Sequence, residues 1–97
     1  MPTYVSLLNF TDQGIRTVRD TLDRMESAAG VAEKHGARLV QNYWTVGSYD
    51  AVIVLEAPDD ESVTAFLLET GSWGNVRTST LRAYNREEMA GIIQRLG

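Results

Sequence analysis

Tyr49 and Asp50, neighbours near the middle of the chain, are the first side chains whose types could do chemistry. A phenol and a carboxylate at the rim of a pocket can bind a ligand through hydrogen bonds. The alternative is that Tyr49 packs on Val46 while Asp50 pairs with Thr45 or with a backbone N–H group, as turn residues commonly do. Successive strand residues point to opposite faces, so we do not expect the two to act as one catalytic unit.

His35 is the only histidine, and the chain has no cysteine. A histidine can serve as a general base or as a metal ligand. Because no second histidine and no cysteine accompany it, the sequence predicts no metal site. His35 also precedes Gly36 at the predicted end of a helix, where the helix dipole stabilises a positive charge. That structural role is the simpler interpretation.

Arg77 lies in a predicted strand, and we expect it beside Asn9 of the first strand. An arginine in this position can bind a carboxylate or a phosphate through two parallel hydrogen bonds. The alternative is an ion pair across a subunit interface with Asp50 or Glu56. The sequence alone leaves both interpretations open.

Trp44 and Trp73 are the two tryptophans, and either could line a ligand pocket. Trp44, in a predicted strand, is more typical of a core residue, whereas Trp73 lies in a loop and could cover a pocket mouth or contact a partner. The chain has no glycine-rich phosphate loop, no nucleophile elbow and no Ser–His–Asp arrangement. We therefore predict no cofactor, and the motifs leave open whether the protein is an enzyme.

The composition excludes several classes of function. The chain has 97 residues, a net charge of -4 and a pI near 4.8, and an acidic surface disfavours nucleic acids and anionic membranes. No apolar run reaches membrane-spanning length, and the N-terminus does not resemble a signal peptide. The lack of cysteine fits the cytoplasm, where we expect the protein to act.

The elements that must position these residues begin with a β-branched and aromatic stretch at 3–10, which predicts a strand. Thr11 or Asp12 can then cap a long helix that ends at Gly36. Its apolar stripe consists of Ile15, Val18, Leu22, Met25, Ala29 and Ala32. Gly30 within this helix suggests a bend or a close packing contact.

Two strands, 37–46 and 49–57, are predicted to form a hairpin around a two-residue turn at Gly47 and Ser48. This register pairs Trp44 with Ala51, and it places Val40 on the same face as Trp44. The paired positions beyond Trp44 and Ala51 are Tyr43 with Val52 and Asn42 with Ile53.

A second helix follows, capped by Asp59 or Asp60 and ended by Gly71. A fourth strand covers 76–84, and a last short helix has Asn85 as its cap. The order strand-helix-strand-strand-helix-strand predicts an α+β, ferredoxin-like βαββαβ fold, with a four-stranded antiparallel sheet, helices on one face and an extra C-terminal helix. We expect residues 1–97 to form a single domain.

The other face of the sheet is predicted to combine Tyr43, Val52 and Val54 with polar side chains. Such a face is too apolar to be left in water, and a second copy of the chain, packed sheet against sheet, is the simplest cover. We therefore predict a homo-oligomer that binds a small apolar or aromatic molecule between its sheets. The candidate ligand-binding residues are Asn9, Tyr43, Tyr49, Asp50 and Arg77.

Three stretches, "MPTYVSLLNFTDQGIR", "YWTVGSYDAVIVLEAPDDE" and "GNVRTSTLRAY", together resemble the GYD domain family. The run that names this family, Gly-x-Tyr-Asp, falls on Gly47, Tyr49 and Asp50. The resemblance covers residues 2 to about 90 and implies a ferredoxin-like or dimeric α/β-barrel fold and homo-oligomers, but no activity. Relatives often carry a proline near "DT"; this chain has Thr21 followed by Leu22, which favours a continuous first helix.

Two other functions stay open at this point. One is a cofactor-independent oxygenase or isomerase of the dimeric α/β-barrel type, with His35 or Tyr49 as its acid or base. The other is a structural or regulatory protein that forms a ring.

Overall fold

The computed structural model describes all 97 residues. Its elements are β1 (Thr3–Phe10), α1 (Asp12–Arg16), the 3-10 turn η1 (Val18–Asp20), α2 (Thr21–Lys34), β2 (Arg38–Trp44), β3 (Ala51–Glu56), α3 (Asp60–Gly71), β4 (Val76–Ala83) and α4 (Arg86–Gln94). The four strands form one antiparallel sheet in the order β2-β3-β1-β4. None of the helices is long and apolar enough to cross a membrane.

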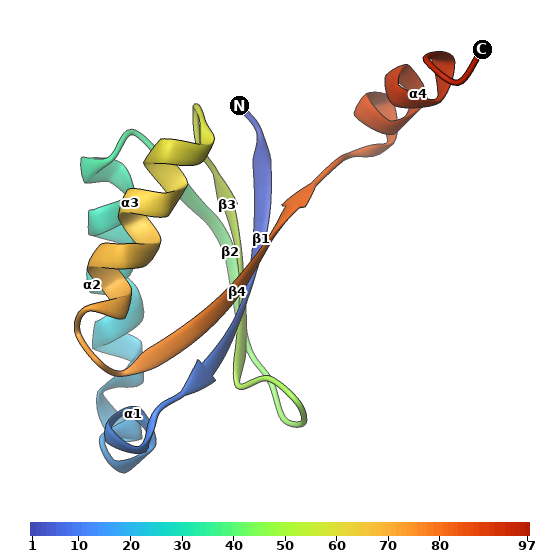
Figure 1. Cartoon of the computed structure of the whole chain (residues 1–97). Helices are drawn as coiled ribbons and strands as arrows, with labels where there is room; N and C mark the ends of the chain where they lie inside the picture. Colours follow the sequence, from blue (N-terminus) through green and yellow to red (C-terminus); the bar gives the residue numbers. More distant parts are fainter.

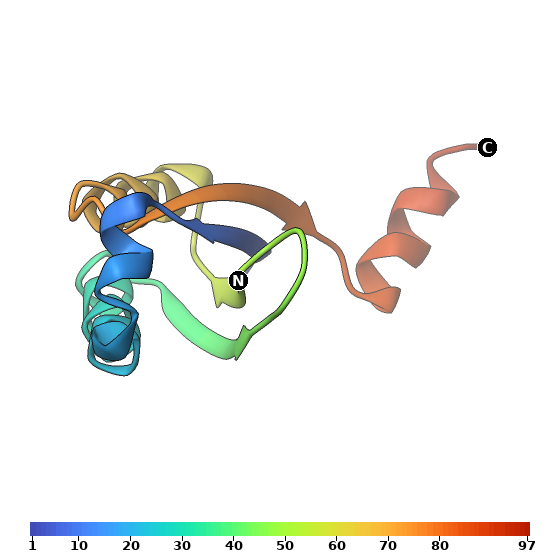
Figure 2. The same cartoon turned by 90° about the horizontal axis from the view of Figure 1, so that it is seen from below.

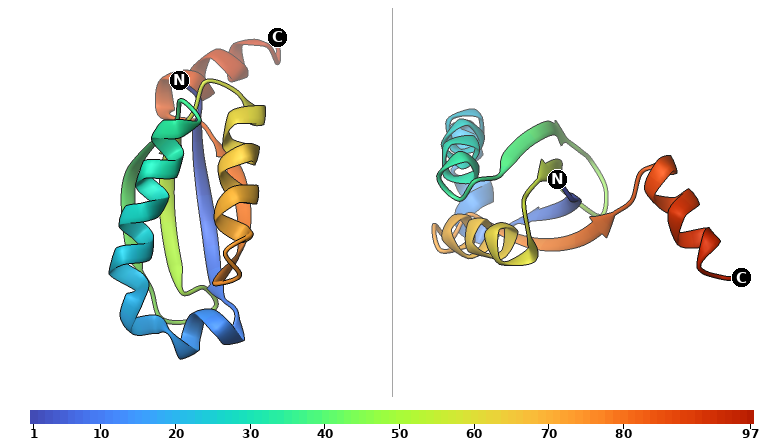
Figure 3. Two further views of the ribbon diagram at one scale, coloured as in Figure 1. Left: turned by 90° about the vertical axis from the view of Figure 1, so that its left-hand side faces the viewer. Right: turned by 90° about the horizontal axis from the view of Figure 1, so that it is seen from above.

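Helices α2 and α3 lie side by side over one face of this sheet, and α1 lies at one end of the layer (Figures 1 and 3). The opposite face carries no helix packed upon it. This arrangement confirms the predicted α+β, ferredoxin-like fold with helices on one face.

Strand β3 shows why the central strands are apolar on both sides. Ala51, Ile53 and Leu55 are buried beneath the helices, and the alternate residues, among them Val52 and Val54, are half-buried on the open face. The predicted pairs of Trp44 with Ala51, Tyr43 with Val52 and Asn42 with Ile53 are confirmed.

The prediction was wrong at Val40. The register shifts between Leu39 and Gln41, so that Leu39 pairs with Leu55, and Val40 lies at a β-bulge. A bulge inserts one residue into a strand and re-aims its neighbours. Leu39 therefore packs against the core in the place predicted for Val40, which is 40% exposed.

The core is small. Its largest fully buried side chains are Phe66 of α3 and Leu55 of β3. Tyr4 of β1 is also buried, and its hydroxyl donates a hydrogen bond to the carboxylate of Asp60 at the start of α3. That hydrogen bond, together with burial, raises the pKa of Tyr4 to about 12.

The prediction of one continuous first helix was wrong, because the helix breaks at Thr17. The Arg24 Nη1 group donates to the carbonyl oxygen and to the hydroxyl of Thr17 at 2.9 and 2.8 Å, and Nη2 donates to the carbonyl oxygen of Gly14 at 3.1 Å. In a continuous helix these two carbonyl groups would accept from backbone N–H groups four residues later. The arginine therefore holds α1 at an angle to α2.

The helix ends follow the predicted capping chemistry with some corrections. Thr11 caps α1, and Asp59 caps α3 by accepting from the Ser62 N–H group at 2.8 Å. Gly36 adopts a positive φ of 75° just after α2, as predicted. Helix α3 ends at Gly71, as predicted. A side chain at Gly30 would meet nothing within 4 Å, so the predicted close packing is absent there.

The predicted two-residue hairpin turn was also wrong. The backbone N–H of Thr45 donates to the carbonyl oxygen of Asp50 at 2.9 Å, but no backbone hydrogen bond joins Val46 to Tyr49. The connection between β2 and β3 is therefore a loop of residues 45–50, in which Gly47 has a positive φ of 128°.

Helix α4 extends from the end of β4 as an arm on the side of the sheet opposite to α2 and α3 (Figure 2). A capping box of Asn85 and Glu88 starts the helix. Arg82 fixes the hinge, because it pairs with Glu88 at 3.3 Å and stacks over the Tyr84 ring at 4.4 Å from its centroid. The apolar stripe of the arm, formed by Met89, Ile92, Ile93 and Leu96, is exposed.

Candidate functional site

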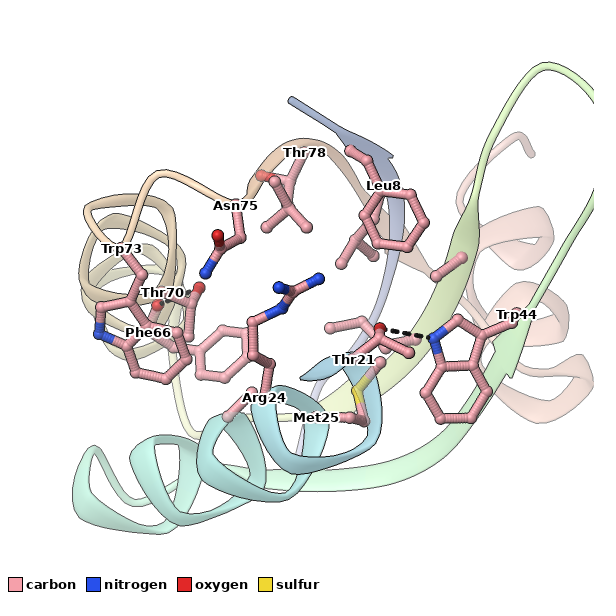
Figure 4. A pocket seen from close by; sticks show the side chains of 15 residues that line it. Leu8, Thr21, Arg24, Met25, Trp44, Phe66, Thr70, Trp73, Asn75 and Thr78 are labelled. Carbon is pink, nitrogen blue, oxygen red and sulfur yellow. Dashed lines mark hydrogen bonds between the residues drawn. The ribbon is translucent and has the colours of Figure 1, made fainter. Parts of the chain in front are cut away.

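A small apolar pocket lies on the helix-covered face of the sheet, between α2, the end of α3 and the strands (Figure 4). Its cavity volume is about 50 Å³. Met25 and Phe66 belong to its apolar wall, and the other lining residues are Leu8, Phe10, Thr21, Arg24, Ala28, Trp44, Ala51, Ile53, Thr70, Trp73, Asn75, Val76 and Thr78. No aspartate or glutamate is among them.

Arg24 carries the only charge in this pocket. Figure 4 shows its side chain rising from α2 with the guanidinium among the lining side chains. No carboxylate lies within ion-pair distance of Arg24, although the chain has more acidic than basic residues. Its protein contacts are the oxygens of Gly14 and Thr17, which fix the direction of the guanidinium.

The loop of residues 73–75 forms another part of the wall, and α1 is bound tightly to it. The Thr11 N–H group donates to the carbonyl oxygen of Asn75 at 3.0 Å. The amide of Gln13 donates to the Trp73 carbonyl oxygen and to the Asn75 side-chain oxygen, each at 2.9 Å. Gly14 is buried at this junction, where a Cβ atom would lie 1.9 Å from the Asn75 carbonyl oxygen.

The two tryptophans lie at different places in the pocket wall. Trp73 follows the end of α3, and Trp44 ends β2, where its Nε1–H group donates to the Thr21 hydroxyl at 3.0 Å. Trp44 was expected in the core, but it is 41% exposed because it lies on an edge strand at the rim of the pocket.

The open face of the sheet holds several of the predicted ligand-binding residues. Asn9 and Arg77 are direct partners across β1 and β4, as predicted, and neither side chain has a hydrogen-bond partner within the chain. Tyr43 lies on β2 at the opposite edge and is 59% exposed. The aliphatic side chains between these edges are Val5, Leu7, Val52 and Val54.

Asp50 and Tyr49 have structural contacts in the structure. The Asp50 carboxylate accepts from the Phe10 N–H group at 2.8 Å, which corresponds to the simpler of the two interpretations. The Tyr49 carbonyl oxygen accepts from the Thr45 hydroxyl at 2.6 Å. Val46 is fully exposed, so Tyr49 does not bury it. Neither Tyr49 nor Asp50 lines the apolar pocket.

His35 ends α2, and its Nε2 atom lies 2.9 Å from an oxygen of Glu69. Lys34 binds the same carboxylate at 3.0 Å. The hydrogen bond with His35 has the largest effect on the pKa of Glu69, followed by that with Lys34, and both lower this pKa below its usual range. His35 does not line the pocket, and its contact with Glu69 is that of a residue at a helix end. No group of three or more His, Asp or Glu side chains could hold a metal ion.

The sequence reasoning missed Arg24 and Asn75. Arg24 lies on the polar flank of a helical stripe, where an arginine is usually solvated. Asn75 lies in a loop whose only conspicuous residue is Trp73. Arg24 and Asn75 meet where the first helix breaks at Thr17. Gly14, within the predicted first turns of that helix, was a signal for the break in this sequence.

Comparison with known proteins gives a family. The family model described as "GYD domain" matches residues 4–93. A curated protein from Thermus thermophilus, named "Glutamine synthetase and cystathionine beta-lyase binding protein", is 36% identical over 97 residues. The alignment covers 99% of both chains.

Two solved structures share the fold. The crystal structure of MtbAldR has a TM-score of 0.69 at 13% identity and matches 88% of this chain, which spans 54% of the length of MtbAldR. The crystal structure of TTHA0845, also from Thermus thermophilus, has a TM-score of 0.56 at 23% identity. The match covers 89% of this chain and 100% of TTHA0845.

Proposed function

This chain belongs to the GYD domain family, and from that premise we propose that it is a self-associating binding protein of the cytoplasm. Its open sheet face takes a second copy of the chain, and the resulting oligomer binds a metabolic enzyme. The observation that carries the proposal is the amount of accessible surface that the single chain leaves uncovered.

The accessible surface of the chain is 6447 Å². A compact monomer of 10.8 kDa is expected to expose about 5,500 Å², so the excess is about 900 Å². A stable protein–protein interface buries about 800 Å² on each partner. The excess therefore has the size of one interface.

The open face of the sheet carries aliphatic side chains in its centre, where a protein–protein interface is usually most apolar. Leu7 and Val52 are adjacent in one row across the open face, and Val5 and Val54 are adjacent in the next. These side chains are already half-buried in the single chain, so covering each of them contributes less than the roughly 1.5–3 kcal/mol of a fully exposed one. The arm α4 lies on the same side of the sheet with its own exposed apolar stripe, so it can extend along the partner.

The polar pair at the edge of this face favours a ligand between the packed sheets as a second candidate. Asn9 and Arg77 lie next to the aliphatic rows without partners in their own chain. In a sheet-to-sheet dimer they would donate to a polar group of a small, mainly apolar or aromatic molecule, with Tyr43 at the other edge. Asp50 and Tyr49 are weaker candidates, because each already makes structural hydrogen bonds.

The proposed enzyme partners come from the Thermus relative, whose name assigns it the binding of glutamine synthetase and cystathionine β-lyase. That relative aligns with this chain from end to end. We therefore propose an enzyme of one of these two kinds as the partner of this chain.

The first test is the solution mass of the wild type and of two lysine variants. Leu7→Lys places a charge in the middle of the open face, and Leu68→Lys places one on the outer side of α3, where Leu68 is 70% exposed. We expect wild type and Leu68→Lys to have multiples of 10.8 kDa, and Leu7→Lys to have the single-chain mass. A wild type with the single-chain mass, or a Leu7→Lys oligomer, would refute self-association through this face.

The second test uses the same three proteins with purified glutamine synthetase and cystathionine β-lyase from the same organism. Binding is measured by the change in mass on mixing. We expect one of the two enzymes to bind wild type and Leu68→Lys, and a lack of binding to both would refute the partner assignment without affecting the first test.

A further inference from the structure

We infer that the pocket beneath α2 and α3 binds a short-chain carboxylic acid, with the carboxylate on Arg24 and Asn75 and the aliphatic tail in the apolar cavity. This site lies on the face of the sheet opposite to the proposed interface. It does not depend on self-association or on an enzyme partner.

Arg24 has the donors that a carboxylate requires. A guanidinium carries five N–H donors, and the contacts to Thr17 and Gly14 use both Nη1 donors and one Nη2 donor. The Nε–H group and the second Nη2 donor form the edge that matches a carboxylate through two parallel hydrogen bonds. That edge has no protein acceptor, and no polar side-chain atom of the chain is both fully buried and unpaired, so solvent or a ligand can reach it.

Asn75 adds a second donor from the opposite wall. Its side-chain oxygen accepts from Gln13 at 2.9 Å, which leaves its NH₂ group without a protein acceptor. In Figure 4 this amide points into the same space as the guanidinium of Arg24. The pocket therefore offers donors and one positive charge but no carboxylate, a combination that selects an anion.

The rest of the cavity defines the tail of the ligand. Met25, Phe66 and Ile53 line it with apolar surface, and its volume of about 50 Å³ exceeds the roughly 10–15 Å³ that a cavity needs to hold one water molecule. A few methylene or methyl groups fill this space. Since no lining residue is an aspartate or glutamate, an α-ammonium group would be desolvated without a counter-charge, so we expect simple acids to bind better than the corresponding amino acids.

The two tryptophans make this proposal measurable, because both line the pocket. We would titrate the full chain with butyrate, with its neutral isostere butyramide and with L-2-aminobutyrate, and record tryptophan fluorescence. We expect a saturable change with butyrate, and at least tenfold weaker binding of the other two compounds. Equal binding of butyrate and butyramide, or no saturable change with butyrate, would overturn the proposal.

Three variants test the residues. Arg24→Gln should weaken butyrate binding at least tenfold, whereas Arg19→Gln, on an arginine outside the pocket, should leave it unchanged. Since Arg24 also holds α1, Ala28→Leu provides an independent test: it fills the cavity wall and keeps the arginine contacts, and it should also weaken binding at least tenfold. Full butyrate binding in Ala28→Leu, with the thermal unfolding midpoint retained, would refute the location of the tail.

Discussion

Replacing Gly14 by alanine should destabilise the protein, although alanine is the better helix former. Gly14 lies within α1 and is buried against the loop of residues 73–75. A Cβ atom there would lie 1.9 Å from the carbonyl oxygen and 2.8 Å from the carbonyl carbon of Asn75. These are backbone atoms, so the clash is relieved only if α1 moves away from the loop.

The magnitude follows from what that movement breaks. Separation lengthens the hydrogen bond from Thr11 N–H to Asn75 (3.0 Å) and that from Gln13 to the Trp73 carbonyl oxygen (2.9 Å). Each contributes about 0.5–1.5 kcal/mol net, and overpacking of a well-packed site costs about 1–3 kcal/mol. The higher helix propensity of alanine relative to glycine offsets about 1 kcal/mol of this loss. We expect a net loss of about 1–5 kcal/mol, which lowers the thermal midpoint by about 4–8 °C per kcal/mol in a domain of this size.

Gly30→Ala is the matched control. Gly30 lies in α2, is exposed, and has open space where a Cβ atom would be added. The same substitution should therefore raise the free energy of unfolding by about 0.5–1 kcal/mol. Thermal and urea unfolding of the two variants measure both effects. The reasoning is refuted if Gly14→Ala is as stable as the wild type or more stable, because α1 would then not be in contact with the loop.

Further predictions concern the arm and two ionisable groups. A chain that ends at Tyr84 should keep its free energy of unfolding to within about 1 kcal/mol, because the Arg82–Glu88 pair that it loses is half-exposed. Its solution mass should fall toward that of a single chain, and an unchanged oligomer would exclude the arm from the interface. Tyr4→Phe should remove the highest step of an alkaline absorbance titration, since the pKa of Tyr4 is raised from 10.0 to about 12. The stability that the Tyr4 hydroxyl contributes is present below pH 10 and is lost as the pH rises toward 12, so a constant difference between wild type and Tyr4→Phe across that range would contradict the Asp60 contact. Glu69→Gln should be less stable than the wild type at neutral pH, and urea unfolding should show this difference vanish as the pH falls below the lowered pKa of Glu69; a difference that persists in acid would mean that the hydrogen bonds with His35 and Lys34 are not its cause.

Much of the sheet could be predicted from the sequence because alternation is a local signal. The pairing of Trp44 with Ala51 follows from the apolar run at 51–55 and from a glycine at the hairpin. The bulge at Val40 could not be predicted, because the core needs one aliphatic side chain at this position and either Leu39 or Val40 can supply it. The structure selects Leu39, and the remainder of β2 shifts by one residue.

The first helix shows how a tertiary contact overrides periodicity. Apolar residues from Ile15 to Ala32 recur at helical spacing across Thr17 without interruption. At the break, Arg24 donates to the carbonyl groups of Gly14 and Thr17, and the Thr17 carbonyl also accepts from the Asp20 N–H group at 3.0 Å. No propensity at Thr17 indicates this contact, so the pocket that depends on it was also missed, apart from its two tryptophans.

The two faces of the sheet separate the two proposed roles, because successive residues of one strand serve different faces. On β1, Leu8 lines the pocket and Leu7 lies on the open face; on β3, Ile53 and Val52 are divided in the same way. A charge at Leu7 should therefore abolish self-association and leave butyrate binding unchanged, while Ala28→Leu should do the reverse. If Leu7→Lys also lost butyrate binding, the pocket would have to be completed by the second copy, and the acid would be a ligand of the oligomer rather than of the chain.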